Sequence, residues 1–204
     1  MEKGSKFLAF AFPVNNEPDA QACLQLLKKK HPKARHFCTA IRLGPDVSIE
    51  RSNDDGEPAG SAGKPILGQL KKEHLTNILI VVVRYFGGTK LGIPGLIEAY
   101  KSSTADALSK ALIIRKTVYS VFEIRMRYEM YPAFKNHILQ AGLPLIEEHF
   151  HEMAEFKIGF KKSGSHLELL SLLKAFSQRD FNTLEDYAQH LEITIDPLEE
   201  EYIL

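Results

Sequence analysis

Long apolar segments and paired cysteines are what this chain of 204 residues lacks. Its longest aliphatic run, residues 78–83, is far too short to cross a bilayer. Residues 1–6 are polar, and no secretory signal pattern follows them. The two cysteines, Cys23 and Cys38, form no CxxC or similar pair, so the sequence gives no sign of a zinc site. These absences predict a soluble, cytoplasmic protein with reduced thiols, no membrane contact and no cofactor.

The glycine-rich segments do not match the known nucleotide-binding loops. Residues 60–64 (Gly-Ser-Ala-Gly-Lys) precede a helix start and resemble an anion cradle, because free N–H groups and a helix N-terminus favour phosphate. A Walker loop, however, needs other residues where this chain has Pro58 and Pro65. The glycines of residues 87–95 also lack the spacing of the dinucleotide fingerprint. The sequence therefore does not predict nucleotide hydrolysis by an enzyme of either of these classes.

Composition and charge describe a globular chain with two different halves. It is 44% hydrophobic and 25% charged, and its length suits one large or two small domains. The net charge is zero, but residues 1–114 hold 16 Lys and Arg against 11 Asp and Glu (+5), and residues 115–204 hold 10 against 15 (−5). The first half also contains the basic run 28–35. This asymmetry suggests a polyanion partner for the first half, although two ordinary solvated surfaces explain it equally well.

Hydrophobic patterns predict an α+β protein of two domains, residues 1–114 and 115–204. In the first, strands are expected at 7–12, 35–43, 47–51 and 77–85, the last buried on both faces and hence central. Helices are expected at 20–30, after a start signal at 15–18, then from residue 65, and from 94 or 95 to about 113.

The second domain shows the order β-α-β-β-α-β, which is typical of a ferredoxin-like fold. Strands are expected at 117–127, 145–151 and 154–161, with a last strand within 184–195. Helices are expected at 132–141 and from 165 to 176, the latter opened by a capping box formed by Ser165 and Glu168.

Three acidic residues, Asp54, Asp55 and Glu57, lie in a loop rich in Gly and Pro. Such carboxylates can hold Mg²⁺, with Asp54 and Asp55 as the candidate ligands. Carboxylates in a loop of this kind more often cap turns or pair with cations, and we favour this interpretation, with Arg84 and Lys90 as the natural cation partners. Residues 84–90 follow the central strand and are expected to face the acidic loop.

His36 and Cys38 are two residues apart, so both lie on one face of a strand. A thiolate–imidazole nucleophile is one interpretation. No third residue that would orient the pair is evident, and we favour a half-buried cysteine in the core with a histidine at its edge. No catalytic residue is assigned.

An anion-binding surface is the second interpretation of the glycine-rich half. Arg84 offers a phosphate contact, while Tyr85 or Phe86 offers a stacking ring. The binding residues expected from the sequence are Ser61, Lys64, His36, Arg84, Tyr85, Phe86, Gly87, Gly88 and Lys90.

Several segments together resemble the IMPACT/YigZ family. They are Lys3-Gly4-Ser5-Lys6-Phe7, Ala34-Arg35-His36-Phe37-Cys38, Asp54-Asp55-Gly56-Glu57-Pro58, Gly60-Ser61-Ala62-Gly63-Lys64-Pro65, the block from Val83 to Gly92, Gly95-Leu96 and Ala99-Tyr100. The resemblance implies an N-terminal α/β sandwich like the ribosomal-protein "domain two" fold, followed by a smaller domain like one in elongation factor G. Eukaryotic members look like regulators of translation that bind the co-activator of a starvation kinase, which bacteria lack. For bacterial-type members it implies a role with RNA or the translation machinery.

Two segments depart from the family pattern at three positions in all. Residues 93–96 are Ile-Pro-Gly-Leu where the family has Ala-Gly-Gly-Leu, and Glu98 stands where the family has Arg. If that Arg contacts phosphate, this protein binds RNA less well or uses Lys90 and Lys101 instead.

The first hypothesis is therefore a non-enzymatic binding protein linked to translation, which contacts RNA or the ribosome through residues 54–64 and 84–95. A protein-interaction regulator of a stress or translation factor is the second. A Mg²⁺-dependent hydrolase acting on a phosphate-containing substrate is the third.

Overall fold

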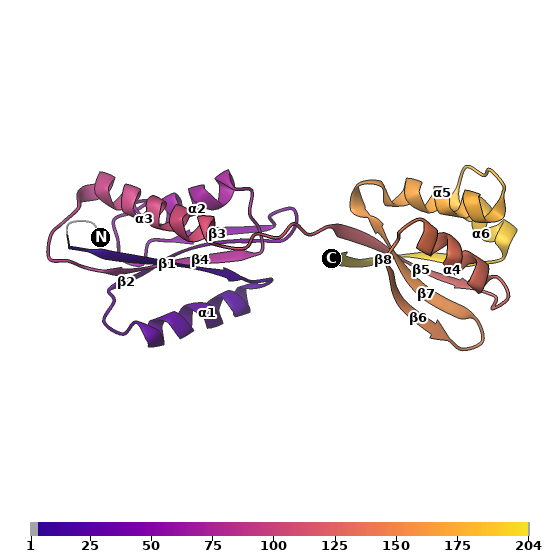
Figure 1. The fold of residues 1–204 in the computed structure, drawn as a ribbon, viewed down its shortest axis with the longest axis horizontal. Helices are drawn as coiled ribbons and strands as arrows, with labels where there is room; N and C mark the ends of the chain where they lie inside the picture. Colours follow the sequence, from indigo (N-terminus) through magenta and orange to yellow (C-terminus); the bar gives the residue numbers. More distant parts are fainter. Residues whose placement is uncertain (1–3, 204) are drawn as a thin grey trace. The chain divides into compact units, whose positions relative to one another are not determined.

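The structure is a computed structural model that describes residues 4–203. The chain divides into two compact units, residues 1–113 and 114–204, called here the N-terminal and the C-terminal unit. Each unit has its own four-stranded sheet with helices packed on it (Figure 1). This mixture of helices and strands, with one sheet in each unit, agrees with the α+β class that the sequence predicts.

The N-terminal unit is an antiparallel sheet between two helical layers. Strands β1 (Lys6–Pro13), β2 (His36–Leu43), β3 (Ile49–Asn53) and β4 (Ile78–Tyr85) lie in the order β1-β4-β2-β3. Helix α1 (Glu17–Lys30) covers one face, and helices α2 (Gly63–Lys72) and α3 (Gly92–Ser109) cover the other (Figure 1).

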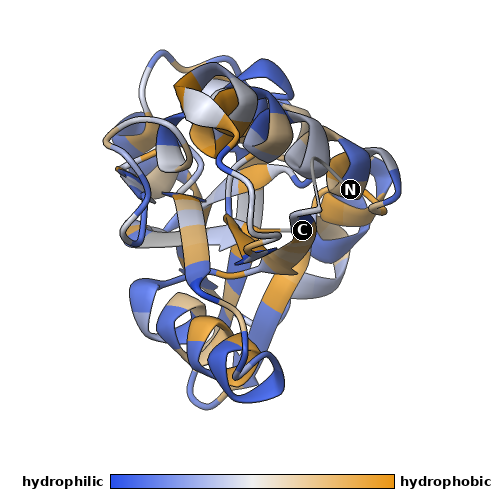
Figure 2. Cartoon of the chain, turned by 90° about the vertical axis from the view of Figure 1, so that its left-hand side faces the viewer, coloured by the Kyte–Doolittle hydropathy of each residue, from blue (hydrophilic) through white to orange (hydrophobic). Residues whose placement is uncertain are grey.

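Strand β4 is central because it is apolar on both faces. Leu79, Val81 and Val83 join the core under α1, while Ile80 and Val82 join the core under α2 and α3. A strand with no polar face must be covered on both sides, so the prediction of a central strand is confirmed. Figure 2 shows apolar colour on the strands at the middle of the view, whereas the surrounding helices carry both apolar and polar bands.

The helix ends follow local chemistry. The Asn16 side chain accepts a hydrogen bond from the Asp19 N–H at 2.8 Å and caps α1, which confirms the start signal. Lysines in the last turn of α1 complement the helix dipole. Helix α2 starts at Gly63 and α3 at Gly92, each two or more residues before the proline or glycine that the sequence suggests.

The C-terminal unit contains the predicted order β-α-β-β-α-β with one additional helix. Its elements are β5 (Val118–Met126), α4 (Tyr131–Gln140), β6 (Leu145–Phe150), β7 (Ala154–Lys161), a 3₁₀ turn η1 (Lys162–Gly164), α5 (Ser165–Ser177), α6 (Leu184–Leu191) and β8 (Thr194–Ile203). The strands pair antiparallel in the order β6-β7-β5-β8. Helices cover one face of this sheet, over a core that includes Phe134, Phe156 and Leu169.

Two local predictions for the C-terminal unit are wrong. The Ser165 side chain forms no cap, because the 3₁₀ turn leads into α5 and the N-cap position is Gly164. Residues 184–191 form helix α6 rather than part of a strand, and the last strand lies further along the chain. Thr183 caps α6 because its side chain accepts a hydrogen bond from the Asp186 N–H at 3.1 Å. The apolar residues of this segment also suit a strand, and in the prediction they outweighed this helix-capping threonine.

Within the described residues 4–203, no helix has the length and apolar character needed to cross a membrane.

Candidate functional site

Asp54 organises the loop between β3 and α2. Its carboxylate accepts hydrogen bonds from the N–H groups of Gly63 (2.7 Å), Gly60 (2.8 Å) and Ala62 (3.0 Å). Partial burial opposes ionisation, but these three bonds and the charge of Lys64 together hold the pKa of Asp54 below its ordinary value. The anion cradle at the start of α2 therefore already contains an anion, which belongs to the chain itself.

Asp55 connects the same loop to strand β2. One carboxylate oxygen accepts from the Phe37 N–H at 2.6 Å, and the Asp55 carbonyl oxygen lies 2.9 Å from His36 Nδ1. A carbonyl can only accept, so His36 Nδ1 carries the hydrogen. Asp55 adopts a left-handed backbone with φ of 44°, and the Asn53 side chain supports this turn by accepting from the Asp55 N–H at 2.7 Å.

Glu57 and Arg84 form a buried ion pair. Arg84 Nη1 lies 2.5 Å from Glu57 Oε1, and the two side chains are only 5% and 3% exposed. The Tyr100 hydroxyl donates to the same carboxylate oxygen at 2.8 Å, and His36 Nε2 is 3.8 Å from it. The end of β4, the acidic loop, α3 and the start of β2 are joined through this one carboxylate.

Cys38 completes the buried cluster from β2. Its Sγ lies 3.0 Å from the Asp54 carbonyl oxygen and 3.2 Å from the Tyr100 hydroxyl. Burial, partly offset by the hydrogen bond with Tyr100, raises the pKa of the Cys38 thiol to about 12. A thiol of this kind stays protonated at neutral pH and is a poor nucleophile. The geometry agrees with a core cysteine beside a histidine, the interpretation that the sequence favours.

The exposed part of the site lies where β4 ends. The Phe86 ring is 39% exposed, and the guanidinium groups of Arg84 and Arg35 lie 5.5 and 5.7 Å from its centroid. Gly87, Gly88 and Lys90 follow and are exposed. Together, Arg35, Phe86, Gly87, Gly88 and Lys90 form what we call the strand-end surface. Its cation–aromatic contacts are of a kind that orders both side chains.

The backbone at Gly87 is close to the start of β1. A Cβ added to Gly87 would fall 2.0 Å from the Gly4 carbonyl carbon, so this position requires glycine. The Gly87 N–H also donates to Ser5 Oγ at 3.2 Å, and Arg84 Nη2 lies 3.5 Å from the same oxygen. Ser5 thus ties the strand-end surface to the buried ion pair.

The remaining predicted binding residues separate into inward and outward positions. Ser61 is buried and its hydroxyl donates to the Pro58 carbonyl at 2.7 Å. The Tyr85 hydroxyl lies 2.8 Å from His31 Nδ1, which holds the ring against α1. Lys64 is exposed. Ser5 and Tyr100 received no role from the sequence beyond their place in the resembling motifs.

The three acidic side chains all have partners inside the fold, but only Glu57 pairs with one of the two expected cations, and Lys90 forms no ion pair with the loop among the described residues. Asp54 and Asp55 accept from backbone N–H groups, and Glu57 pairs with Arg84. Across residues 4–203, no group of three or more His, Cys, Asp or Glu side chains is arranged to hold a metal ion. A Mg²⁺ ion at Asp54 and Asp55 would have to compete with the bonds that shape the loop.

Comparison with known proteins places this site in a family. The model of the Impact N-terminal domain matches residues 3–108. The chain belongs to the IMPACT family. It is similar to the IMPACT family member YvyE of Bacillus subtilis (strain 168), with 37% identity over 153 residues that cover 75% of this chain and 70% of YvyE. It is also similar to the IMPACT family member YigZ of Escherichia coli (strain K12), with 39% identity over 128 residues, 62% of this chain and 63% of YigZ.

A solved structure supports the fold over almost the whole chain. The crystal structure of a hypothetical protein matches with a TM-score of 0.65 and 28% identity, and the match covers 98% of this chain and 92% of that one. The shared fold therefore includes both units and is not confined to the part that the family model matches.

Proposed function

We propose that this IMPACT-family chain is a non-enzymatic, cytoplasmic binding protein that acts with the translation machinery and contacts RNA through the strand-end surface. The observation that carries the proposal is the exposed Phe86 ring beside the guanidinium of Arg35. A half-exposed aromatic ring offers a face on which a base can stack, and a neighbouring Arg offers a phosphate contact.

The distribution of charge supports an RNA ligand. Residues 1–114 carry a net charge of +5, and Lys64 and Lys90 are exposed beside the loops that the site comprises. Of the three acidic residues in the loop, Glu57 is paired with Arg84 inside the fold, and Asp54 and Asp55 are engaged in hydrogen bonds with backbone N–H groups. In this assignment the buried Arg84 guanidinium packs against the Phe86 ring, while the exposed Lys90 and Arg35 side chains contact the phosphates of the RNA.

The link to translation rests on family membership and on the resemblance described above. We further propose that the C-terminal unit is a ferredoxin-like module of the kind found in elongation factor G, which its strand order β6-β7-β5-β8 supports. The N-terminal unit would correspond to the ribosomal-protein "domain two" fold.

Binding of fluorescently labelled transfer RNA, measured by anisotropy at about 50 and 200 mM salt, tests the RNA proposal. Phe86→Leu keeps an apolar side chain but removes the ring, and we expect it to weaken binding by about 1–3 kcal/mol. Lys90→Gln should lower the slope of log affinity against log salt by about 1. Lys72→Gln, a change of an exposed lysine at the end of α2, is the matched control and should bind as wild type does.

Binding that ignores salt, or Phe86→Leu and Lys90→Gln variants that bind as tightly as the control, would refute an RNA-contacting strand-end surface. A protein partner would then become the leading assignment for the same loops.

A further inference from the structure

The two edges of the N-terminal sheet are built differently. Strand β3 is only five residues long and carries the charged residues Glu50 and Arg51, two features that protect an edge from pairing. Strand β1 has eight residues, and every residue from Phe7 to Phe12 is apolar. Its register with β4 runs without a bulge from Lys6 to Pro13. The outer edge of β1 therefore lacks the usual protection along its length.

The register shows which backbone groups of β1 face outward. The Val14 N–H donates to the Asn77 carbonyl at 3.0 Å, so this pair is a hydrogen-bonded pair of the antiparallel ladder. Such pairs alternate, which directs the N–H and C=O groups of Phe7, Ala9 and Ala11 away from β4. In the described part of the chain, none of the turn, loop and cap hydrogen bonds engages these groups.

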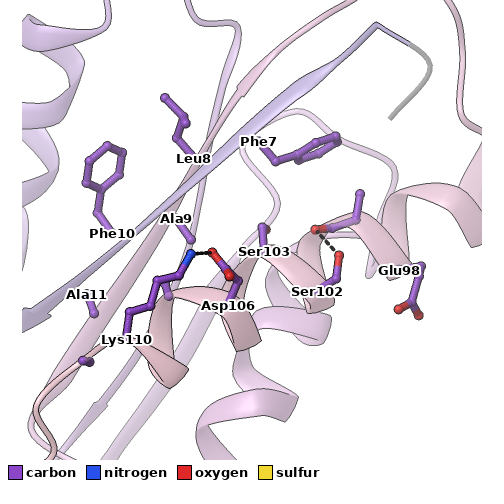
Figure 3. Close-up of a pocket in the computed structure, with 13 residues that line it drawn as sticks. Phe7, Leu8, Ala9, Phe10, Ala11, Glu98, Ser102, Ser103, Asp106 and Lys110 are labelled. Atoms are coloured by element: carbon purple, nitrogen blue, oxygen red, sulfur yellow. Dashed lines mark hydrogen bonds and ion pairs between the residues drawn. The ribbon is translucent and has the colours of Figure 1, made fainter. Parts of the chain in front are cut away.

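A groove of about 880 Å³ follows this edge, between β1 and α3 (Figure 3). Phe7, Ala9 and Ala11 belong to the face of β1 that packs toward α3. Across from them, α3 contributes mainly small residues, which are Ala99, Ser102, Ser103 and Ala107. Small side chains on both sides leave room for larger ones from outside, and the volume is typical of a ligand site.

We propose that this groove binds an extended segment of a partner protein, which pairs antiparallel with β1 and adds a fifth strand to the sheet. The backbone of Phe7, Ala9 and Ala11 would supply the hydrogen bonds, and apolar side chains at alternate positions of the partner would enter the groove. This surface is separate in its residues from the strand-end surface, so the proposal goes beyond the proposed RNA contact.

Charge at the two ends of the groove defines the partner further. Glu98 lies at the Phe7 end and Lys110 at the Ala11 end (Figure 3), and their side chains are 70% and 72% exposed. Each forms an ion pair with a neighbour, Glu98 with Lys101 at 3.9 Å and Lys110 with Asp106 at 2.7 Å, and exposed pairs of this kind are weak enough to open for the charge of a partner. An antiparallel partner begins at the Ala11 end. We therefore infer a segment with an acidic residue before its apolar positions and a basic residue after them.

A second copy of this chain does not fit the same edge. Antiparallel pairing of two β1 strands would put both α3 helices on one face of the joined sheet. Among the strands, helix α3 packs chiefly on β1. Neighbouring strands lie only about 4.8 Å apart, whereas packed helices need about 8–10 Å between axes. The two helices would collide. A lone extended segment has no such helix, so the groove suits a partner peptide.

The probe for this proposal is a synthetic nine-residue peptide that alternates valine and threonine between an acidic N-terminal and a basic C-terminal residue. We expect its titration into the full-length protein to shift the NMR amide signals of Phe7, Ala9 and Ala11 and to slow their hydrogen exchange. N-methylation of alternate peptide residues on the edge that faces β1 should abolish binding. N-methylation on the opposite edge should leave binding unchanged, because only one edge of the added strand meets the protein.

Two matched variants test the wall of the groove. Ala107→Leu fills the groove from α3 and should weaken peptide binding at least about tenfold, which corresponds to about 1.4 kcal/mol. Ala105→Leu makes the same change on an exposed position of the same helix outside the groove, and binding should stay within about twofold. Equal effects of the two changes would contradict the proposal.

Three other results would overturn it. One is that the NMR amide signals do not shift at about 1 mM peptide, whether the central residue of the peptide is valine, leucine or phenylalanine. The second is peptide binding that leaves the three β1 amides unchanged or ignores both patterns of N-methylation. The third is concentration-dependent dimerisation that protects these amides without peptide, which would assign the edge to a second copy.

Discussion

Removal of one partner from the buried Arg84–Glu57 pair should destabilise the N-terminal unit more than replacement of both. The pair is 2.5 Å long and its side chains are 5% and 3% exposed, so a remaining charge would be buried without its counter-ion. That situation typically costs about 3–5 kcal/mol. We expect this loss for Arg84→Met and for Glu57→Gln measured separately. For a unit of this size, it lowers the midpoint of thermal unfolding by roughly 12–20 °C.

The double variant, Glu57→Gln with Arg84→Met, should lose only about 1–2 kcal/mol. It contains no buried charge, and the Tyr100 hydroxyl, which donates to Glu57 at 2.8 Å, can donate to the amide oxygen of the new side chain. Denaturant unfolding followed by circular dichroism measures all three variants as a double-mutant cycle.

An exposed ion pair is the control for this cycle. Lys110 and Asp106 lie 2.7 Å apart, but their side chains are 72% and 64% exposed. Lys110→Met should therefore stay within about 0.5 kcal/mol of wild type. If the losses from the two single changes at Glu57 and Arg84 simply add in the double variant, the reasoning from burial is wrong, since independent sites add and a coupled buried pair does not.

Three shorter predictions follow from the same loops. Asp54→Asn should lower stability at pH 7, and its effect should shrink as the pH falls. The pKa of Asp54 is lower in the folded state than its ordinary value, so its contribution is fully present above about pH 4 and is lost as the pH falls through the folded value. Denaturant titrations at pH 7 and at progressively lower pH would show this loss. Gly87→Ala should lower the free energy of unfolding by about 2 kcal/mol or more, as an overpacked core does, because the added Cβ would meet backbone atoms. Gly88→Ala has open space around the added Cβ but a φ of 86°, so it should cost about 1 kcal/mol when measured by the same denaturant titration. Cys38, with a pKa of about 12, should react with a thiol reagent at pH 8 far more slowly than the partly exposed Cys23, and equal rates in the folded protein would contradict the buried cluster.

The sequence predicted the elements whose periodicity is strong. Residues 78–83 are apolar throughout, so β4 could only form a covered central strand. The start of α1 follows from Asn16 and its hydrogen bond to the first turn of the helix. Helix α6 was missed because its apolar residues also suit a short strand, and its Thr183 cap was overlooked. Short amphipathic segments near the end of a domain remain ambiguous until packing decides between the two periods.

The candidate site was predicted in its residues but not in the direction that each side chain faces. A sequence shows that acids and bases flank one strand, but the loop geometry decides which of them meet. The Glu57 side chain points inward to Arg84, and the Asp54 side chain accepts hydrogen bonds from the start of α2, the helix that follows its loop. The role of Tyr100 depends on α3 crossing the same cluster, a contact between residues 43 positions apart that local patterns do not contain.

This division into an inner frame and an outer surface determines how variants of the site must be interpreted. Arg84→Ala would remove both the partner of Glu57 and a guanidinium beside Phe86, so weaker RNA binding by that variant would not distinguish a lost contact from a loosened fold. Phe86 and Lys90 are exposed, and changes there keep both Arg84 and Glu57, the two members of the buried pair. We therefore expect Phe86→Leu and Lys90→Gln to keep the wild-type unfolding midpoint, and only RNA binding that falls while this midpoint stays constant would support a direct contact.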